Sequence, residues 1–133
     1  MQEYGLVRVE IKIGMKIESL KFGEITIDGK KYHQIIIVGD EIIERNSIKL
    51  HKKFGTTHQM LEEEKVLLFK GEPKVVVIAD GFDRQFEVSE DIRQKALEKK
   101  IELLILDTPT AVRKFNELKR HSDKINALFH TTC

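Results

Sequence analysis

KVVVIADG, residues 74–81, is an almost unbroken apolar run that ends in an Asp-Gly turn dipeptide. The β-branched residues of the run indicate a strand, and the lack of polar alternation indicates that both faces of the strand are buried. Such strands are typical of parallel sheets that carry cover on both sides. We therefore predict a buried strand at this run and assign the neighbouring elements relative to it.

Two more apolar runs follow, residues 101–106 (IELLIL) and residues 125–130 (INALFH), and each comes after a helical pattern. Ser89 is expected to cap the first helix, and Thr108 to cap the second with Pro109 in the first helical position. Strand, helix, strand, helix and strand at these spacings predict right-handed crossovers and three parallel strands. The inner helix faces are predicted to consist of Ile92, Ala96, Leu97, Ala111, Val112, Phe115 and Leu118.

The first half of the chain has a period of two, which predicts strands. The predicted strands are residues 7–13, 17–22, 25–27, 32–38 and 42–45. Asp28-Gly29 and Gly39-Asp40 are turn dipeptides, so the strands should form an antiparallel meander, with no helix before residue 57. A helix is then predicted over residues 58–69.

The two halves together predict a mixed α/β (α+β) fold. An antiparallel β-meander packs on a three-stranded parallel βαβαβ unit, in three layers of the order β/β/α. A length of 133 residues suits one globular domain, which we place at residues 15–133, with residues 1–14 as an additional N-terminal strand.

Composition excludes several classes of protein. Apolar residues make up 41% of the chain, charged residues 34%, and the formal net charge is +1, so disorder and non-specific nucleic-acid binding are not expected. No apolar run is long enough to cross a bilayer. A single cysteine, the lack of a secretory signal and the abundance of Ile, Glu and Lys favour a cytoplasmic protein from a heat-loving source.

Polar residues follow each of the three parallel strands. The carboxyl ends of such strands meet at one edge of the sheet, where ligands usually bind. The helix 58–69 should run antiparallel to the strand after it, which places the start of that helix over the same edge. The sequence therefore predicts a cleft lined by Thr56, His58, Asp80, Gly81, Asp107, Thr108 and His130.

Each of these residues also has a purely structural interpretation. Asp107 and Thr108 are typical helix-opening residues, and Asp80-Gly81 is a common turn. His130 at a strand end is more often a hydrogen-bonded imidazole than a base. The histidines and the single cysteine show no metal-binding spacing, and the glycines show no phosphate-binding motif, so neither a metal nor a cofactor is predicted.

Four short motifs in a fixed order resemble those of a known family. The motifs are Phe22-Gly23, Gly55-Thr56-Thr57-His58, the segment from Asp107 to Leu118 and the terminal Phe129-His130-Thr131-Thr132-Cys133. They are similar to those of small single-domain archaeal and bacterial proteins of unknown function, whose relatives include the human adipogenesis-associated cytoplasmic protein and the mitochondrial respiratory complex I assembly factor 3. The resemblance implies an antiparallel sheet against a second sheet flanked by helices, and no established catalytic activity.

The distinctive residues of that family fall on Arg45, Gly55, Thr56, His58, Gly81, Asp107, Thr108, Ala111, Asn116, His130, Thr132 and Cys133. Two positions depart from the family pattern. Ala79-Asp80-Gly81 stands where Gly-x-Gly is frequent, and Phe115 stands where a tyrosine is common. A ligand shared by the family is therefore not assumed for this chain.

These observations favour a non-enzymatic binding or assembly module with a protein partner. The alternative is an enzyme in which Cys133 or His58 works with Asp80 on a small anionic substrate held by Thr108 and the amides after it. Because residues 7–13 would form a long β-branched edge, the sequence also predicts a homo-oligomer. Neither a membrane nor a nucleic acid is an expected partner.

Overall fold

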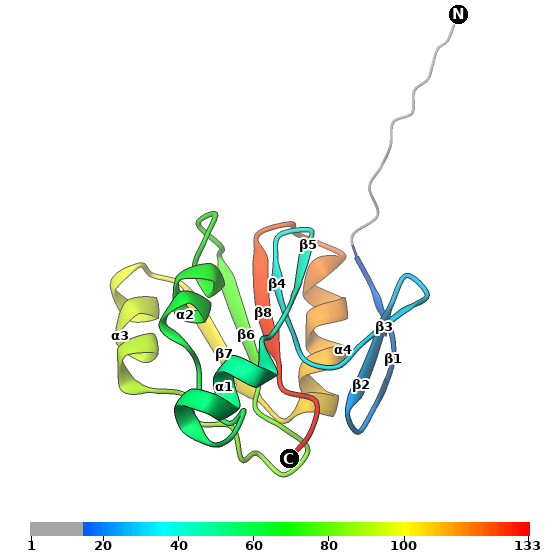
Figure 1. Ribbon diagram of the computed structural model, residues 1–133. Coiled ribbons are helices and arrows are strands. Elements are labelled where there is room, and N and C mark those ends of the chain that lie inside the picture. The colour runs from blue at the N-terminus through cyan, green and yellow to red at the C-terminus, as the bar shows by residue number, and fades with distance from the viewer. Residues whose placement is uncertain (1–14) are drawn as a thin grey trace, which may run out of the picture.

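The computed structural model describes residues 15–133, so the predicted strand 7–13 lies outside the described residues. The described chain contains four helices and eight strands in two sheets, and Figure 1 shows how they are arranged. The elements are β1 (Ile17–Lys21), β2 (Glu24–Ile27), β3 (Lys30–Tyr32), β4 (Ile35–Val38), β5 (Glu41–Glu44), α1 (Ser47–Phe54), α2 (Glu62–Leu68), β6 (Val75–Ala79), α3 (Glu90–Glu98), β7 (Glu102–Leu106), α4 (Thr108–Lys119) and β8 (Ile125–Phe129).

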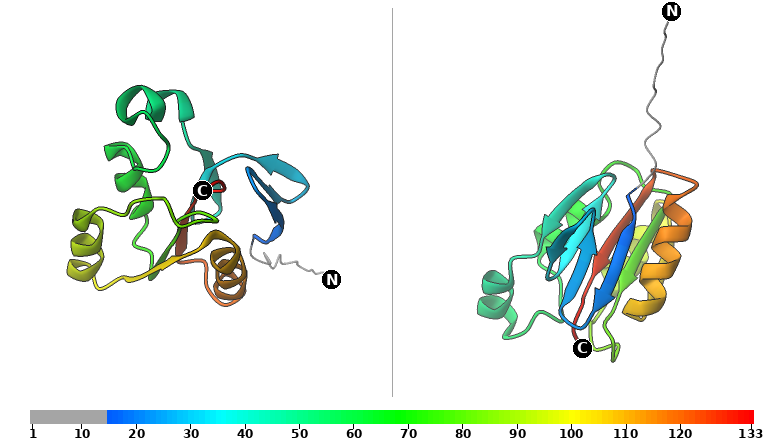
Figure 2. Two further views of the ribbon diagram at one scale, coloured as in Figure 1. Left: turned by 90° about the horizontal axis from the view of Figure 1, so that it is seen from below. Right: turned by 90° about the vertical axis from the view of Figure 1, so that its right-hand side faces the viewer.

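The larger sheet has five strands in the order β5-β4-β8-β6-β7, and the smaller has the order β1-β2-β3. β6 pairs in parallel with both β7 and β8, as the spacing of the apolar runs predicts. Helices α2 and α3 cover one face of the larger sheet, whereas α4 and the smaller sheet cover the other (Figure 2). The predicted mixed α/β class and its three layers are confirmed.

The predicted meander is divided between the two sheets. β1, β2 and β3 form a sheet of their own, while β4 pairs antiparallel with β8 and carries β5 into the larger sheet. The reason lies in Ile35, Ile36 and Ile37, which are all buried. Because their side chains pack on opposite faces, β4 needs cover on both sides, and an interior position in the larger sheet supplies it.

Two helix predictions were wrong. Helix α1 begins at Ser47, although no helix was predicted before residue 57. Its ends carry local signals, since the Asn46 side chain accepts a hydrogen bond from the amide of Lys49 and Gly55 adopts a left-handed φ of 75°. Only Leu50 of the helix is buried, so the sequence shows no clear apolar stripe.

The predicted helix 58–69 begins only at Glu62. Carbonyl groups just before that point are already used elsewhere: Arg45 donates to those of Thr57 and Gln59, and the Glu87 amide donates to that of His58. These contacts hold residues 57–59 outside the helix.

In α3, Ile92 and Ala96 face inward as predicted, but Leu97 is 72% exposed and does not belong to the inner face.

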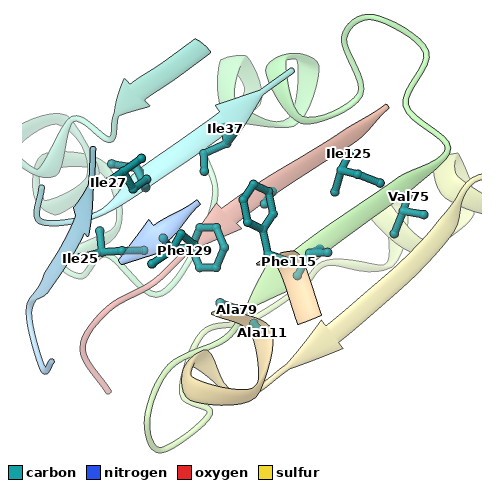
Figure 3. Packing of buried hydrophobic residues seen from close by; sticks show 13 residues of the cluster. Ile25, Ile27, Ile37, Val75, Ala79, Ala111, Phe115, Ile125 and Phe129 are labelled. Atoms are coloured by element: carbon teal, nitrogen blue, oxygen red, sulfur yellow. The ribbon is translucent and has the colours of Figure 1, made fainter. Parts of the chain in front are cut away.

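Two apolar clusters form the core, one on each face of the larger sheet. Figure 3 shows the cluster beneath α4, where the rings of Phe115 and Phe129 meet edge to face with centroids 5.5 Å apart. This cluster also takes in Ile25 and Ile27 of the smaller sheet. Phe115, which stands where a tyrosine is common in the family-like pattern, is fully buried in this apolar cluster.

Across residues 15–133, no helix combines the length and the apolar character required to span a bilayer.

Candidate functional site

The centre of the candidate site is a buried guanidinium, that of Arg45 at the end of β5. Arg45 is 8% exposed, and its Nε and Nη2 donate to the two carboxylate oxygens of Glu64 at 2.8 and 3.1 Å. The remaining donors reach Gln34 Oε1 at 2.8 Å and the carbonyl oxygens of Thr57 at 3.1 Å and Gln59 at 2.8 Å. All five N–H groups of the guanidinium therefore have acceptors.

Glu64 balances this charge from the first turn of α2. It is 4% exposed, and its Oε1 also accepts the amide of Leu61 at 2.9 Å, so the same carboxylate pairs with Arg45 and caps α2. The centroid of the Phe86 ring lies 5.2 Å from the Arg45 guanidinium, which is a cation–π contact. Arg45 thus ties β5, the segment 57–59 and α2 together.

Gln34 carries the network from Arg45 to His130. Its Nε2 donates to the Thr57 hydroxyl at 3.1 Å, which leaves Oε1 to accept from both Arg45 and His130 Nδ1, the latter at 2.8 Å. His130 therefore carries its proton on Nδ1, and Nε2 accepts from the Thr132 hydroxyl at 3.3 Å. The imidazole is neutral and bonded at both nitrogens.

Burial is the main reason why the pKa of His130 falls to about 3, and electrostatic repulsion of its protonated form by His58, Arg45 and His33 acts in the same direction. The side chain is fully buried. The unfolded chain would bind a proton near the ordinary histidine pKa of 6.5, whereas the folded chain would not until about pH 3. Stability from this residue is complete above pH 6.5 and is lost as the pH falls toward 3.

We accordingly expect the free energy of unfolding to be about 2 kcal/mol lower near pH 5 than near pH 7.5. Urea denaturation at the two pH values measures the difference. The His130→Asn variant is the control, because its amide does not titrate, and it should show a smaller change between the same conditions. Equal stability of the unmodified protein at both pH values would contradict the assignment.

A second set of contacts joins the three strand ends. The Thr108 hydroxyl donates to the carbonyl of His130 at 2.6 Å and accepts the amide of Gly81 at 2.9 Å. The Thr108 amide donates in return to the Gly81 carbonyl at 3.1 Å. Gly81, Thr108 and His130 therefore lie side by side at the carboxyl edge of the parallel strands.

Helix α4 is capped by Asp107 rather than by Thr108, so that prediction was wrong by one residue. The Asp107 carboxylate accepts the amide of Thr110 at 3.0 Å and its hydroxyl at 2.9 Å. The amide bond is the largest cause that holds the pKa of Asp107 below its ordinary value of 3.8. The Thr108 hydroxyl is occupied by the contacts between strand ends and so cannot cap.

Replacing Asp107 with alanine should cost about 1 kcal/mol of stability, because it removes the cap of α4. Since the folded pKa is lowered, the ionic part of this contribution is present above pH 3.8 and is lost as the pH falls through the lower folded value. Thermal unfolding at neutral pH checks the loss. The Asp107→Asn variant is the control, because it keeps a capping oxygen and should retain most of the stability.

Asp80 is buried and pairs with Arg84, whose Nε lies 3.1 Å from each carboxylate oxygen. Burial nevertheless raises the pKa of Asp80, with Arg84 opposing the rise. The ring of His58 packs against that of His130, edge to face, with the two centroids 5.0 Å apart. The Thr56 hydroxyl accepts the His58 amide at 3.2 Å.

The predicted cleft residues thus fall into three groups. The first group lies in contact just after the end of β8 and consists of His58, Gly81, Thr108 and His130. The second group, Asp80 and Asp107, lies beside the first and bonds to nearby residues. The third is Thr56, whose hydroxyl accepts the amide of His58. Thr108 and His130 are fully buried, and Asp80 is 6% exposed. The contacts among these residues are those of a buried polar network.

A pair of aromatic rings lies at the surface of this edge, next to exposed polar residues 83–85. Phe22, between β1 and β2, is 58% exposed, and its ring centroid lies 5.5 Å from that of half-buried Phe82. The last residues run between these segments: the amides of Gly23 and Phe82 donate to the carbonyls of Thr131 and Thr132. Half-buried Cys133 follows, and its carbonyl oxygen accepts the amides of residues 83 and 85.

The other family-like residues have structural roles in the described fold. Gly55 ends α1, and Ala111 is a fully buried residue on the inner face of α4. The side chain of Asn116 joins α4 to β1 through both the amide and the carbonyl of Ile17, at 2.8 and 3.0 Å. Thr132 bonds to His130 as described above.

A cavity of about 420 Å³ lies beside the network rather than within it. It touches the network at Gln59 and contains none of the seven predicted cleft residues. Its lining is formed by Lys53, Phe54, Gln59, Met60, Glu62, Lys65, Glu87, Val88 and Ser89. Within the described part of the chain, no three His, Cys, Asp or Glu side chains are grouped to hold a metal ion.

The sequence-based prediction missed three members of the network, Gln34, Glu64 and Phe86. A signal existed for Glu64, which stands three residues after Leu61 and four before Leu68 and therefore lies on the buried face of its helix. Gln34 directly precedes an apolar strand and gave no comparable signal. Phe86 lies in a segment without secondary structure, where no pattern predicts burial.

A family model described as "Protein of unknown function (DUF498/DUF598)" matches residues 17–130. The chain belongs to this family. The predicted resemblance to small proteins of unknown function is confirmed at that level, because the DUF498/DUF598 match covers nearly all of the described residues. No curated protein matches the chain.

Solved structures agree with the DUF498/DUF598 assignment. A conserved hypothetical protein, PH1505 from Pyrococcus horikoshii OT3, is 29% identical with a TM-score of 0.76, over 90% of this chain and 100% of that one. MT938 is 24% identical with a TM-score of 0.69, over 90% and 99% of the two chains. A Bordetella pertussis protein described as an Mth938-like domain is 14% identical with a TM-score of 0.56, over 96% and 92%. The last two likenesses show the fold alone.

Proposed function

We propose that the protein is a non-enzymatic binding or assembly module that presents the carboxyl edge of its parallel strands to a protein partner. The observation that carries the proposal is the complete internal pairing of His130. Its two ring nitrogens bond to Gln34 and Thr132, and its lowered pKa keeps it neutral. A histidine held in this way stabilises the fold and has no free nitrogen for acid-base catalysis.

The neighbouring groups support the same conclusion. The Asp107 carboxylate caps a helix, the Thr108 hydroxyl is bonded on both sides, and Asp80 pairs with Arg84. At this edge, the rings of exposed Phe22 and half-buried Phe82 are accessible to a partner. Exposed aromatic side chains are favourable anchors in protein interfaces. The expected kinship of this family to the mitochondrial respiratory complex I assembly factor 3, which rests on the sequence resemblance alone, supports this role.

The partner surface is tested with two variants that each remove an exposed apolar side chain. A protein retained from cell extract by the immobilised chain should be lost with Phe22→Ser and kept with Leu97→Ser, since Leu97 is 72% exposed at the end of α3, just before the amino end of β7 and so at the opposite end of the parallel strands. Loss with both variants, or with neither, would argue against the carboxyl edge as the binding surface.

The alternative is a thiol-dependent enzyme, and half-buried Cys133 at the same edge is the observation that favours it. Alkylation by iodoacetamide near pH 6 distinguishes the two functions, because only the thiolate reacts. For a binding module, the native protein should react no faster than the same protein in urea. A faster reaction of the native protein would mark an activated thiolate and support the enzyme.

The proposal includes a homo-oligomer, a cytoplasmic location and a heat-adapted source. The sequence of residues 7–13 supports oligomerisation, because its β-branched positions would offer an edge for pairing. Light scattering on the full chain should give a mass above that of one copy. A single-copy mass at all concentrations would contradict the oligomer and leave the binding edge untouched.

A further inference from the structure

β7 is the last strand of the larger sheet, beyond β6, and is drawn in yellow in Figure 1. Within residues 15–133 it pairs with β6 alone. Four consecutive apolar side chains, from Leu103 to Leu106, are half-buried along it. The strand contains no proline, lysine or bulge, which are the common means of protecting an edge.

The opposite edge of the same sheet differs. In β5 the apolar residues Ile42 and Ile43 lie between exposed Glu41 and Glu44, so the edge carries a charge at each end. In β7 only Glu102, at the first position, is charged. Of the two edges, β7 is therefore the one whose side chains favour association.

The hydrogen bonds show which backbone groups of β7 point outward. The Glu102 amide donates to the Lys74 carbonyl, and the Leu106 carbonyl accepts the Asp80 amide, so positions 102, 104 and 106 face the β6 side. Leu103 and Ile105 then direct their amides and carbonyls away from the sheet. Arg84 confirms this direction, since its Nη2 donates to the Ile105 carbonyl at 3.2 Å from the outside.

We propose that β7 pairs antiparallel with β7 of a second copy of this chain, about a two-fold axis at Leu104. In this register Leu103 of each copy faces Ile105 of the other. The outward amides and carbonyls of both residues then pair, giving two hydrogen-bonded pairs related by the axis, with the Ile105 carbonyl accepting the partner amide through the lone pair that Arg84 does not use. The two larger sheets become one continuous sheet. This inference rests on the proposed homo-oligomer and gives it a surface within the described residues.

Charge favours the antiparallel arrangement over a parallel one. Arg84 lies at the carboxyl end of the β7 edge with its side chain 54% exposed, while Glu102 lies at the amino end. Antiparallel pairing brings Glu102 of one copy beside Arg84 of the other. Parallel pairing in register would instead bring the two Glu102 carboxylates together. Leu104 meets its own counterpart in a pair without hydrogen bonds, where Cα atoms lie about 4.5 Å apart.

A disulfide cross-link tests this register. Because that Cα separation suits a disulfide, Leu104→Cys in the full chain, with Cys133→Ser, should give a covalent dimer on mild oxidation. Ile43→Cys in the same background is the control, since Ile43 is a half-buried apolar residue of the β5 edge, and it should remain uncross-linked. A dimeric mass without a cross-link at Leu104, or equal cross-linking at both positions, would overturn the pairing but keep the oligomer.

Amide hydrogen exchange tests the same pairing without substitution. On dilution from dimer to monomer, exchange at Leu103 and Ile105 should accelerate at least about tenfold, whereas the Leu104 amide, which faces β6, should change little. Unchanged exchange at Leu103 and Ile105 across a dissociation seen by light scattering would overturn the proposal. So would a dimer abolished by Ile11→Lys but not by Leu104→Lys. A monomer at every concentration would overturn both this inference and the homo-oligomer.

Discussion

Replacing Glu64 with glutamine is expected to destabilise the protein by about 3–5 kcal/mol, the usual cost of breaking a buried ion pair by removing one partner. Arg45 cannot release its proton, so its charge would stay buried without a counter-ion. The variant would also weaken the contact that caps α2. Urea denaturation at neutral pH measures the loss through the free energy of unfolding.

Two comparisons separate the ion pair from other effects. Glu63→Gln changes the adjacent carboxylate, which pairs with Lys49 at the surface, where solvent screens the charges. It should therefore have a much smaller effect. The second comparison repeats Glu64→Gln in a chain that carries Arg45→Met, where no buried positive charge is left without a counter-ion, so the substitution should cost much less there than in the unmodified protein. An equal cost in the two backgrounds would mean that an uncompensated charge is not the cause.

The substitution Gly81→Ala is expected to cause the second large loss of stability. Gly81 has a φ of 113°, and a Cβ at this position would overlap the backbone carbonyl of Cys133 and approach His130 Cδ2 to 3.1 Å. Backbone strain costs roughly 1–3 kcal/mol, and forced displacement of packed atoms roughly another 1–3 kcal/mol. A loss of about 2–6 kcal/mol should follow, with displacement of the last residues from the Phe82 segment.

Gly29→Ala is the matched control for the cost of backbone strain. Gly29 also has a positive φ, 78°, but no atom lies within 4 Å of an added Cβ. Its cost should stay near that of the left-handed conformation alone, about 1–2 kcal/mol. Thermal unfolding of the two variants side by side gives the comparison. Similar losses at both glycines would mean that the contact with Cys133 is not important for stability.

The parallel half of the fold was predictable because each buried strand is a continuous apolar run and each helix after it begins with a local signal. The split of the meander could not be predicted, because the choice between pairing β4 with β3 or with β8 depends on residues 92 positions further along the chain, as in the pair of Ile36 with Leu128. The α1 helix was missed for the opposite reason. Its cap signals are local, but it buries a single leucine and leaves no apolar period to detect.

The candidate site divides in the same way. Gly81, Thr108 and His130 could be placed together because parallel topology brings strand ends to one edge. The hub of the network, Arg45, was recognised only as a family-like residue, and its partners Gln34 and Glu64 come from segments that sequence spacing does not connect. Buried polar networks depend on long-range geometry. A single sequence therefore indicates their members one at a time and not as a group.

The central position of β8 has a consequence for how the chain folds. β8 lies between β4 and β6, and it is the last strand of the described chain. Until β8 is in place, no strand pairing joins the β4–β5 hairpin to the β6–β7 pair, and the two core clusters lack the residues that β8 contributes. Contacts between distant segments slow folding, because loop closure must come before the gain in stability. The sheet should therefore form late and cooperatively, and during synthesis the edges of β4 and β6 stay exposed until residues 125–129 have left the ribosome.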